Sequence, residues 1–352
     1  MIVIKDTPLQ NKGNILVTGG AGYVGCHACK ALAVAGFTPV TLDNLVRGHE
    51  WAVKWGPLEV GDVTDARRVA DVVKKYRPVG VMHFAAFAYV GESVEHPERY
   101  YANNVVGSFQ LLQALNRAGI RNIVFSSTCS TYGIPDRIPI SEDHQQVPVN
   151  PYGTGKLMIE TMLRDLDLAY DMPSVSLRYF NAAGADPGGE VGEDHDPETH
   201  AVPLAITTAL GERPVFEIYG TDYETDDGTA VRDYVHVADL ATAHVRALEY
   251  LLAGGKRTAL NLGTGRGHSV RELIGSVEHV SGKAVAVREG PRRAGDPPVL
   301  VADASKAKEI LEWQPEYAEL DAIVDTALRW HLHRSDAFSA HKRHGGKRTT
   351  IK

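Results

Sequence analysis

The sequence has little of three features that mark particular classes of protein. Only three of its 352 residues are cysteines, Cys26, Cys29 and Cys129, so they cannot all pair in disulfides. The N-terminal stretch MIVIKDTPLQ does not resemble a signal peptide, because Lys5 and Asp6 interrupt it before an apolar core can form. There is no excess of positive charge, because the net charge of −7 argues against general binding to nucleic acid or to an anionic membrane. The most apolar stretch, residues 79–91, contains His83 and falls short of the ~18 apolar residues that a membrane span requires. We therefore expect a cytoplasmic protein without nucleic-acid or membrane partners.

The first half of the chain alternates short apolar runs with longer segments rich in helix-forming residues. The short runs predict strands and the longer segments predict helices. Uninterrupted alternation with strands apolar on both faces predicts an α/β fold, namely a Rossmann-type doubly wound parallel sheet covered on both sides. The predicted strands span residues 14–20, 37–44, 79–84, 122–127 and 174–180, and the predicted helices span 23–35, 65–76, 97–118 and a segment from Tyr152 onward.

The alternation ends after Phe180, where the glycine- and acid-rich stretch NAAGADPGGEVGEDHDPETH begins. A second, smaller mixed α/β domain is therefore predicted, with helices at 203–210, 240–252 and 270–280 and strands at 216–219 and 260–263. The predicted organisation is an N-terminal extension at 1–13, a first domain at 14–180, a second domain at 181–334 from which about 234–263 returns to the first, and a disordered basic tail at 335–352.

The stretch TGGAGYVG places Gly19, Gly22 and Gly25 between a predicted strand and a predicted helix. Glycines in this setting permit a tight turn and let backbone amides approach a pyrophosphate at the positive end of the helix. Asp43 ends the second strand, where a carboxylate can accept both hydroxyls of an adenine ribose and would repel a 2′-phosphate. The pattern therefore favours NAD over NADP as the cofactor.

A second acid, Asp62, follows the next short strand in VGDVTD. It could hold an adenine amino group, or it could be the N-cap of the following helix. The residues leave both interpretations open.

Tyr152 and Lys156 in NPYGTGK lie four residues apart on one predicted helix, so their side chains share a face. A phenol with a pKa near 10 is a poor base at neutral pH. An adjacent ammonium and a positively charged nicotinamide ring would lower that pKa. Together with Lys156 and with Thr128 at the end of a nearby strand, the Tyr152 phenol could take a proton from a carbinol during hydride transfer.

These motifs, together with HFAAFAYVGESV, FSSTCSTYG, LRYFNAAGADP and PRRAGDPP, resemble the extended short-chain dehydrogenase/reductase family and, within it, the branch of UDP-glucose 4-epimerases. The resemblance extends from about residue 14 to residue 334. It implies tightly bound NAD, removal of a hydride from C4 of a UDP-sugar, rotation of the 4-keto intermediate, and return of the hydride to its other face. UDP-glucose and UDP-galactose are the expected pair, and we expect a homodimer.

The resemblance also implies a role for each matching residue. Tyr152 is the expected base, Lys156 is its partner, and the Thr128 hydroxyl assists at the sugar oxygen. The residues implied for NAD are Gly19, Gly22, Tyr23, Val24, Gly25, Asp43, Asn44, Asp62, Val63, Phe84, Ala85, Ala86, Asn103, Ser126, Tyr152, Lys156 and Phe180. Those implied for the UDP-sugar are Thr128, Tyr152, Asn181, His200, Tyr219, Arg232, Arg293, Asp296 and Leu300.

Several positions depart from the pattern of the family. Ala88 stands where such epimerases often have a lysine, and His200 stands where they often have an asparagine. Leu300 stands where narrow-specificity bacterial epimerases have a tyrosine, which predicts a wider wall beside the sugar C2 substituent.

The loop that contains Asp194, His195, Asp196, Glu198 and His200 raises the question of a metal site. We expect no metal, because the loop is polar and predicted to be flexible and because the implied chemistry requires none.

Related enzyme classes differ at two positions beside Thr128. Sugar-nucleotide dehydratases and decarboxylases of this scaffold resemble one another in having acidic residues there, whereas this chain has Cys129 and Ser130. The open alternatives are a UDP-xylose/UDP-arabinose 4-epimerase and a non-catalytic NAD-binding regulator.

Overall fold

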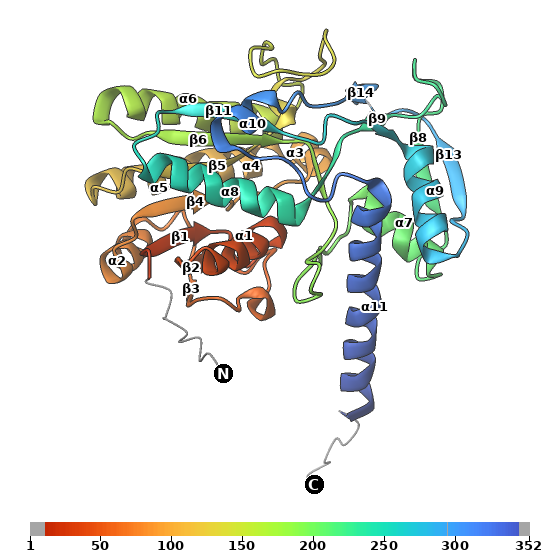
Figure 1. Cartoon of the computed structure of the whole chain (residues 1–352), viewed down its shortest axis with the longest axis horizontal. Coiled ribbons are helices and arrows are strands. Elements are labelled where there is room, and N and C mark those ends of the chain that lie inside the picture. Colours follow the sequence, from red (N-terminus) through yellow and green to blue (C-terminus); the bar gives the residue numbers. More distant parts are fainter. Residues whose placement is uncertain (1–10, 294, 345–352) are drawn as a thin grey trace, which may run out of the picture.

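The computed structural model describes residues 11–293 and 295–344 (Figure 1). Seven parallel strands form its largest sheet, in the order β11-β6-β5-β4-β1-β2-β3. Because the strand order reverses direction between β1 and β4, their carboxyl ends flank a crevice of the kind in which α/β sheets bind ligands. The strands are β1 (Asn14–Thr18), β2 (Thr38–Asp43), β3 (Leu58–Val60), β4 (Gly80–His83), β5 (Ile123–Thr128), β6 (Ser174–Tyr179) and β11 (Thr258–Leu262).

Helices cover both faces of this sheet, as Figure 1 shows. The side chains of β1 alternate between the two faces. Ile15 and Val17 pack in an apolar cluster with α1 (Tyr23–Val34) and α8 (Val237–Leu252). Leu16 packs in a separate cluster on the other face, with α2 (Ala66–Tyr76), α5 (Gly107–Arg117) and α6 (Pro151–Tyr170). The arrangement confirms the predicted doubly wound α/β fold.

The predicted helix at 97–118 is present but is interrupted. After the short helix α3 (Val90–Glu95), the chain forms α4 (Pro97–Tyr100), a π-helical segment η2 (Tyr101–Val106) and then α5. Within η2, the Asn104 side chain accepts a hydrogen bond from the Phe87 amide and donates one to the Phe87 carbonyl. The π turn thus fastens this helix to the loop that follows β4, and such turns are frequent at functional sites.

Beyond Phe180 the chain forms smaller sheets around a third apolar cluster, which includes Ile206, Leu273 and Val324. Two segments return to the large sheet: β11 pairs with β6, and α8 packs against α1. The other elements are β7 (Asn181–Ala183), α7 (Ala201–Ala209), β8 (Phe216–Tyr219), β9 (Val231–Arg232), β10 (Tyr234–His236), β12 (His268–Ser269), α9 (Val270–Ser281), β13 (Val287–Gly290), β14 (Val299–Leu300), α10 (Ser305–Leu311) and α11 (Leu320–His344), with short 3-10 turns at Glu50–Ala52 and Cys129–Thr131.

The end of the chain differs from the prediction of a disordered tail from Ser335. Helix α11 continues to His344, so the prediction of disorder is wrong for residues 335–344. The physical reason is that this stretch contains no glycine or proline to end the helix, and Gly345 follows it directly. Most of the predicted N-terminal extension (residues 1–10) and the last eight residues of the predicted tail (345–352) lie outside the described residues.

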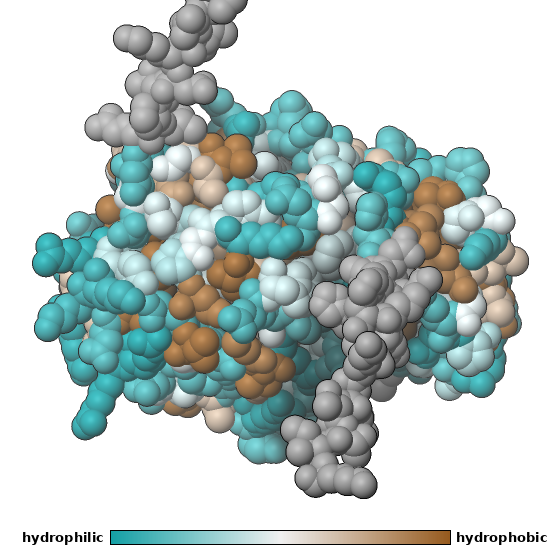
Figure 2. Space-filling view, turned by 90° about the horizontal axis from the view of Figure 1, so that it is seen from below, coloured by the Kyte–Doolittle hydropathy of each residue, from teal (hydrophilic) through white to brown (hydrophobic). Residues whose placement is uncertain are grey.

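The surface seen in Figure 2 is mainly hydrophilic, with apolar side chains in small groups. Among the residues that the structure describes, no helix combines the length and hydropathy needed to cross a bilayer.

A buried ion pair fixes helix α6 to the sheet. The Arg178 guanidinium of β6 donates to both carboxylate oxygens of Glu160 on α6, with the shortest N–O distance at 2.6 Å. The two side chains are only 7% and 8% exposed. Ser127 on β5 also donates to Glu160, at 2.5 Å. Because α6 carries Tyr152 and Lys156, this pair determines where those side chains lie.

We predict that Arg178→Met lowers the free energy of unfolding by about 3–5 kcal/mol, because it leaves a buried carboxylate without its partner. Urea denaturation followed by circular dichroism measures the change. The control is Arg164→Met. Arg164 is a half-exposed residue of α6 that pairs with exposed Asp165, so its loss should change the free energy of unfolding by less than about 0.5 kcal/mol. Equal losses in the two variants would contradict the prediction.

Candidate active site

A cavity of about 1340 Å³ opens at the carboxyl ends of the central strands and extends toward the smaller sheets. Sites for one small ligand usually measure roughly 300–1,000 Å³, so this cavity has room for two ligands side by side. Every residue that the sequence predicts for cofactor, substrate or catalysis lines it, with the single exception of Asp62.

The glycine loop forms one end of the cavity. Gly19 has a φ of +73°, and a Cβ atom there would lie 2.6 Å from the Ala85 nitrogen. A Cβ on Gly25 would lie 2.1 Å from the Gly19 carbonyl oxygen. Helix α1 begins after Gly22, and no side chain caps its first amides. A loop that excludes side chains and leaves a helix N-terminus uncapped beside a cavity is suited to a pyrophosphate.

Asp43 lies beside this loop and is buried. Its carboxylate accepts hydrogen bonds from the amides of Ala21 at 3.0 Å and Leu45 at 2.9 Å. Burial raises its pKa, and the two amide hydrogen bonds oppose that rise. Each carboxylate oxygen keeps a further lone pair, so the group can still accept hydrogen bonds from a ligand.

Asp62 is turned toward Asn44, whose side-chain nitrogen donates to it at 2.7 Å. Its other oxygen accepts from the amide and the hydroxyl of Thr64. The N-cap of α2 is Asp65, which accepts from the amides of Arg67 and Arg68. The interpretation of Asp62 as that N-cap is therefore wrong, because Asp65 makes the capping bonds.

The predicted catalytic residues meet at the centre of the cavity wall. Asn150 caps α6 by accepting from the Gly153 amide at 2.8 Å, and Pro151 occupies the first turn, so the helix begins immediately before Tyr152. The Lys156 ammonium donates to the Ser126 carbonyl at 2.8 Å and lies 5.8 Å from the centre of the Tyr152 ring. Thr128, at the end of β5, lines the same wall.

The protein's own groups do not ionise the phenol. Burial raises the pKa of Tyr152 well above its ordinary value, which is opposite to the expected direction, and a weaker contribution from Thr128 lowers it. Burial also lowers the pKa of Lys156 from 10.5 to about 7, so this group is only partly charged near neutral pH. An ionised phenol therefore requires a further positive charge in the cavity.

Cationic and aromatic side chains lie at the opposite end. The Arg293 guanidinium lies over the Tyr219 ring, 3.9 Å from its centre. Arg232 lies 3.4 Å from Asp296 and donates to its neighbouring Val231 carbonyl. Two guanidinium groups on one wall can bind a diphosphate, even in a protein whose net charge is negative.

Sequence reasoning missed one member, Glu193, of a group of residues in the loop between β7 and α7. Glu193 is buried and faces the imidazoles of His195 and His200, while Glu198 lies beside them. Burial would lower the pKa of His200, but the two carboxylates outweigh it and raise that pKa to about 9. The spacing E-x-H-x-x-E-x-H was the available signal for Glu193. Glu193 was left out because it stands in a stretch whose composition is typical of a polar loop.

Comparison with known proteins places the chain in a family. Residues 15–263 match the family described as "NAD dependent epimerase/dehydratase family". The chain belongs to the NAD dependent epimerase/dehydratase family. The match begins in β1 and ends just after β11, so it contains the whole of the large sheet apart from Asn14.

Relatives in this family are similar over most of the chain. A UDP-glucose 4-epimerase of Rhizobium meliloti (strain 1021) is 53% identical over 327 residues, which are 93% of this chain and 99% of that protein. A crystal structure of UDP-glucose 4-epimerase from Brucella ovis in complex with NAD is 52% identical, covering 90% of this chain and 97% of that chain with a TM-score of 0.88. An epimerase structure from Bifidobacterium longum in complex with NAD+ and UDP has a TM-score of 0.88 at 36% identity, covering 92% and 100% of the two chains.

The depressed pKa of Lys156 predicts a pH dependence of stability in the nucleotide-free protein. Between pH 7 and pH 10.5 the unfolded chain binds a proton at Lys156 that the folded chain has released. The free energy of unfolding should therefore gain a contribution that is complete above pH 10.5 and is lost as the pH falls to about 7.

Urea denaturation at about pH 7 and about pH 10 measures this dependence. Lys156→Met should show a smaller gain with rising pH than the parent protein. Lys308→Met, at an exposed position on α10, should keep the gain of the parent. The same gain in all three proteins would contradict the assignment of the titration to Lys156.

Proposed function

We propose that this protein is a UDP-glucose 4-epimerase that interconverts UDP-glucose and UDP-galactose with tightly bound NAD. The observation that carries the proposal is the convergence of Tyr152, Lys156 and Thr128 on one wall of a cavity with room for both a dinucleotide and a nucleotide sugar. The similarity to UDP-glucose 4-epimerases over nine-tenths of the chain supports it.

The residues at the glycine loop fit NAD. A Cβ atom on Gly19 or Gly25 would clash with the backbone at Ala85 or at Gly19, so glycine is needed for the tight turn at the cavity, and no side chain caps the first amides of α1. Asp43 can accept the ribose hydroxyls and would repel a 2′-phosphate. When bound, NAD supplies the acceptor and later the donor of the hydride exchanged with C4 of the sugar.

The protein's own groups move the proton and hold the sugar. The Tyr152 phenolate accepts the proton of the C4 hydroxyl, and the Thr128 hydroxyl hydrogen-bonds the same oxygen. The Lys156 ammonium, held by the Ser126 carbonyl, stabilises the phenolate electrostatically. Arg232 and Arg293 hold the diphosphate, so the 4-keto sugar can turn over and present its other face while the nucleotide stays bound.

Three further features belong to the proposal. Cys129 and Ser130, the neighbours of Thr128, supply no carboxylate that would drive elimination.

We propose a homodimer, because Phe109 on α5 and Met158 on α6 are apolar and exposed on helices that contact each other. A cytoplasmic location agrees with free, buried cysteines.

Tyr152→Phe tests the assignment of the base. We predict that it lowers kcat by about 10²–10⁴-fold or more while bound NAD is retained, because only the proton acceptor is lost. The measurement is UDP-galactose turnover without added NAD, together with the NAD content of the purified protein. Tyr170→Phe, at an exposed position on the same helix, is the control and should keep full activity.

A Tyr152→Phe enzyme as active as the parent would exclude Tyr152 as the base. Turnover of UDP-xylose but not of UDP-glucose by the parent would favour the pentose 4-epimerase. Bound NAD without turnover of any UDP-sugar would favour a non-catalytic regulator.

Leu300 on β14 tests how wide the sugar site is. It lines the cavity and pairs with Arg232 of β9, so it is fixed in place. Because leucine is shorter than tyrosine, we predict efficient turnover of UDP-glucose and slower, measurable turnover of UDP-N-acetylglucosamine. Leu300→Tyr should suppress only the N-acetylated reaction, and Leu300→Met, which conserves volume, should preserve both. Values of kcat/KM for the two substrates measure this, and unchanged ratios in Leu300→Tyr would exclude Leu300 from that wall.

A further inference from the structure

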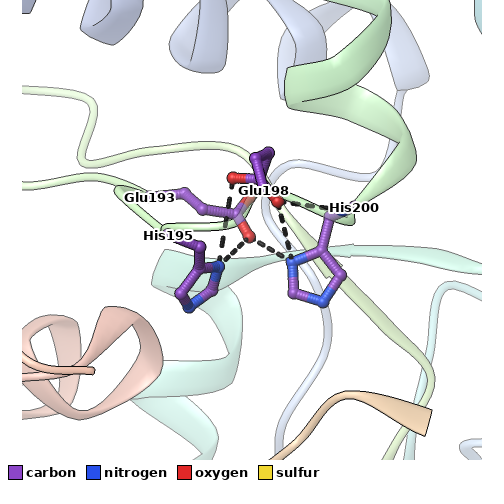
Figure 3. A group of neighbouring side chains, drawn as sticks. All are labelled: Glu193, His195, Glu198 and His200. Carbon is purple, nitrogen blue, oxygen red and sulfur yellow. Dashed lines mark hydrogen bonds and ion pairs between the residues drawn. The ribbon is translucent and has the colours of Figure 1, made fainter. Parts of the chain in front are cut away.

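Four side chains of one short loop turn their donor atoms toward a common point. They are Glu193, His195, Glu198 and His200, and one potential ligand atom from each lies within 4.8 Å of all the others. Figure 3 shows the two carboxylates between the two imidazole rings. The His195 Nδ1 atom lies 3.0 Å from Glu193 Oε1 and 4.0 Å from Glu198 Oε2. His200 Nδ1 contacts the same Glu193 oxygen and lies 3.8 Å from Glu198 Oε1.

The close approach of these donor atoms requires either hydrogen bonds or a cation between them. Two carboxylates close together repel each other, and Glu193 is only 5% exposed, so water cannot screen that repulsion fully. The Nδ1 atoms of both rings approach one Glu193 oxygen. Each ring therefore either carries a proton on Nδ1 and donates it to that oxygen, or shares a metal ion with it.

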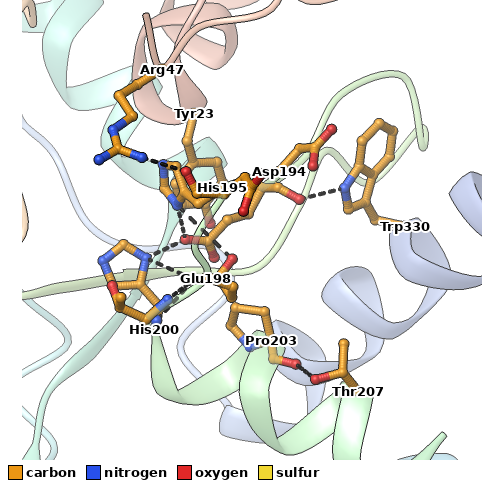
Figure 4. Close-up of polar contacts among 12 residues, drawn as sticks. Tyr23, Arg47, Asp194, His195, Glu198, His200, Pro203, Thr207 and Trp330 are labelled. Carbon is orange, nitrogen blue, oxygen red and sulfur yellow. Dashed lines mark hydrogen bonds and ion pairs between the residues drawn. The ribbon is translucent and has the colours of Figure 1, made fainter. Parts of the chain in front are cut away.

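Contacts from outside the loop hold the cluster in position (Figure 4). The Trp330 indole of α11 donates to the Glu193 carbonyl at 2.9 Å. The His195 ring makes edge-on contacts with Tyr23 and Tyr89, at centre distances of 6.1 and 5.8 Å. Arg47 donates to the Asp196 carbonyl. The loop that was expected to be flexible is therefore anchored by several separate elements, and this removes the main reason for expecting no metal.

We propose that Glu193, His195, Glu198 and His200 bind one divalent first-row transition metal ion, with Zn²⁺ the favoured member. Two imidazole nitrogens and two carboxylate oxygens suit Zn²⁺, which prefers four tetrahedral ligands at roughly 2.0–2.2 Å. Ligand atoms at those distances lie about 3.3–3.6 Å from one another. The present separations reach 4.8 Å, so changes of roughly 1–1.5 Å in these separations complete the shell.

The position of the site suggests its role. His195, Glu198 and His200 line the large cavity, so an ion can enter from there. In Figure 3 the second nitrogen of the His200 ring points away from the four donor atoms. A metal on Nδ1 would keep the proton on that second nitrogen, which can then donate to an anion in the cavity. The ion would thus fix the loop and orient one wall of the substrate site.

Untagged holoenzyme tests the proposal, because the chain's other histidines and any tag could also bind metal. The protein is stripped with a chelator, its zinc content is measured by mass spectrometry after stoichiometric Zn²⁺ is returned, and affinity is measured against a chromophoric chelator. Visible absorption after Co²⁺ substitution reports the coordination geometry. Retained NAD and an unchanged circular dichroism spectrum show that each variant is folded.

We expect one zinc ion per chain and a four-coordinate cobalt spectrum. Glu198→Gln and Glu193→Gln should each weaken zinc binding by at least about tenfold. Asp196→Asn, an exposed acid of the same loop outside the cluster, should bind zinc as the parent does. Two results overturn the proposal: a parent protein that takes up no zinc, which leaves a proton-held cluster, or equal zinc affinity in Glu198→Gln, Glu193→Gln and the parent. If Glu193→Gln does not fold, Glu198→Gln decides alone.

Discussion

The position of helix α6 relative to the sheet depends on the buried ion pair between Arg178 and Glu160, and the geometry of the catalytic wall depends on α6. The pair does not act alone. The Arg178 guanidinium also donates to the Tyr132 hydroxyl at 2.9 Å, and that hydroxyl donates to Asn261 of β11 at 2.7 Å. A polar network therefore connects β5, β6, β11 and α6 beneath the site. Because each member is hydrogen-bonded, its burial costs less than that of isolated charges.

Burial has opposite consequences at the two functional ends of the cavity. At the catalytic wall it disfavours the charged forms of both Tyr152 and Lys156, so the protein by itself holds a neutral phenol. At the end where we propose that the diphosphate binds, Arg232 and Arg293 supply guanidinium groups, which are more weakly hydrated than an ammonium and suit buried ion pairs. In the proposed reaction the substrate binds through its phosphates, and ionisation of the phenol requires a second positive charge. Proton abstraction in that reaction therefore depends on the cofactor.

The sequence predicted most of the fold, and nearly every residue that it assigned to the site lines the cavity, for identifiable physical reasons. Alternation of apolar runs with helical segments is a local signal, so the parallel sheet and its helices followed from it. Gly19 and Tyr152 were predictable because turn geometry and helical spacing restrict which residues can serve there. The role of Asp62 was not predictable from the sequence. Whether this side chain caps a helix or contacts a ligand depends on the neighbour that it meets in the fold, which is Asn44.

The other failures have a similar origin. The π turn at η2 depends on the tertiary contact between Asn104 and Phe87, which no local pattern contains. Glu193 becomes a buried residue only because α11 returns from more than a hundred residues away to place Trp330 against its backbone. A segment rich in glycine and acid reads as solvated loop until such distant partners are known.

The return of β11 to the large sheet has a consequence for synthesis on the ribosome. Strand β6 ends at Tyr179, but its edge is not paired until Thr258–Leu262 has been made, and α8 must also arrive before α1 is covered. A nascent chain that ends after β6 therefore exposes an open sheet edge and the apolar side of α1 that α8 later covers. Contacts of such long sequence separation form slowly, because the entropy of closing the intervening loop is lost before the contacts form. The large sheet is thus complete only after the chain has been translated as far as Leu262.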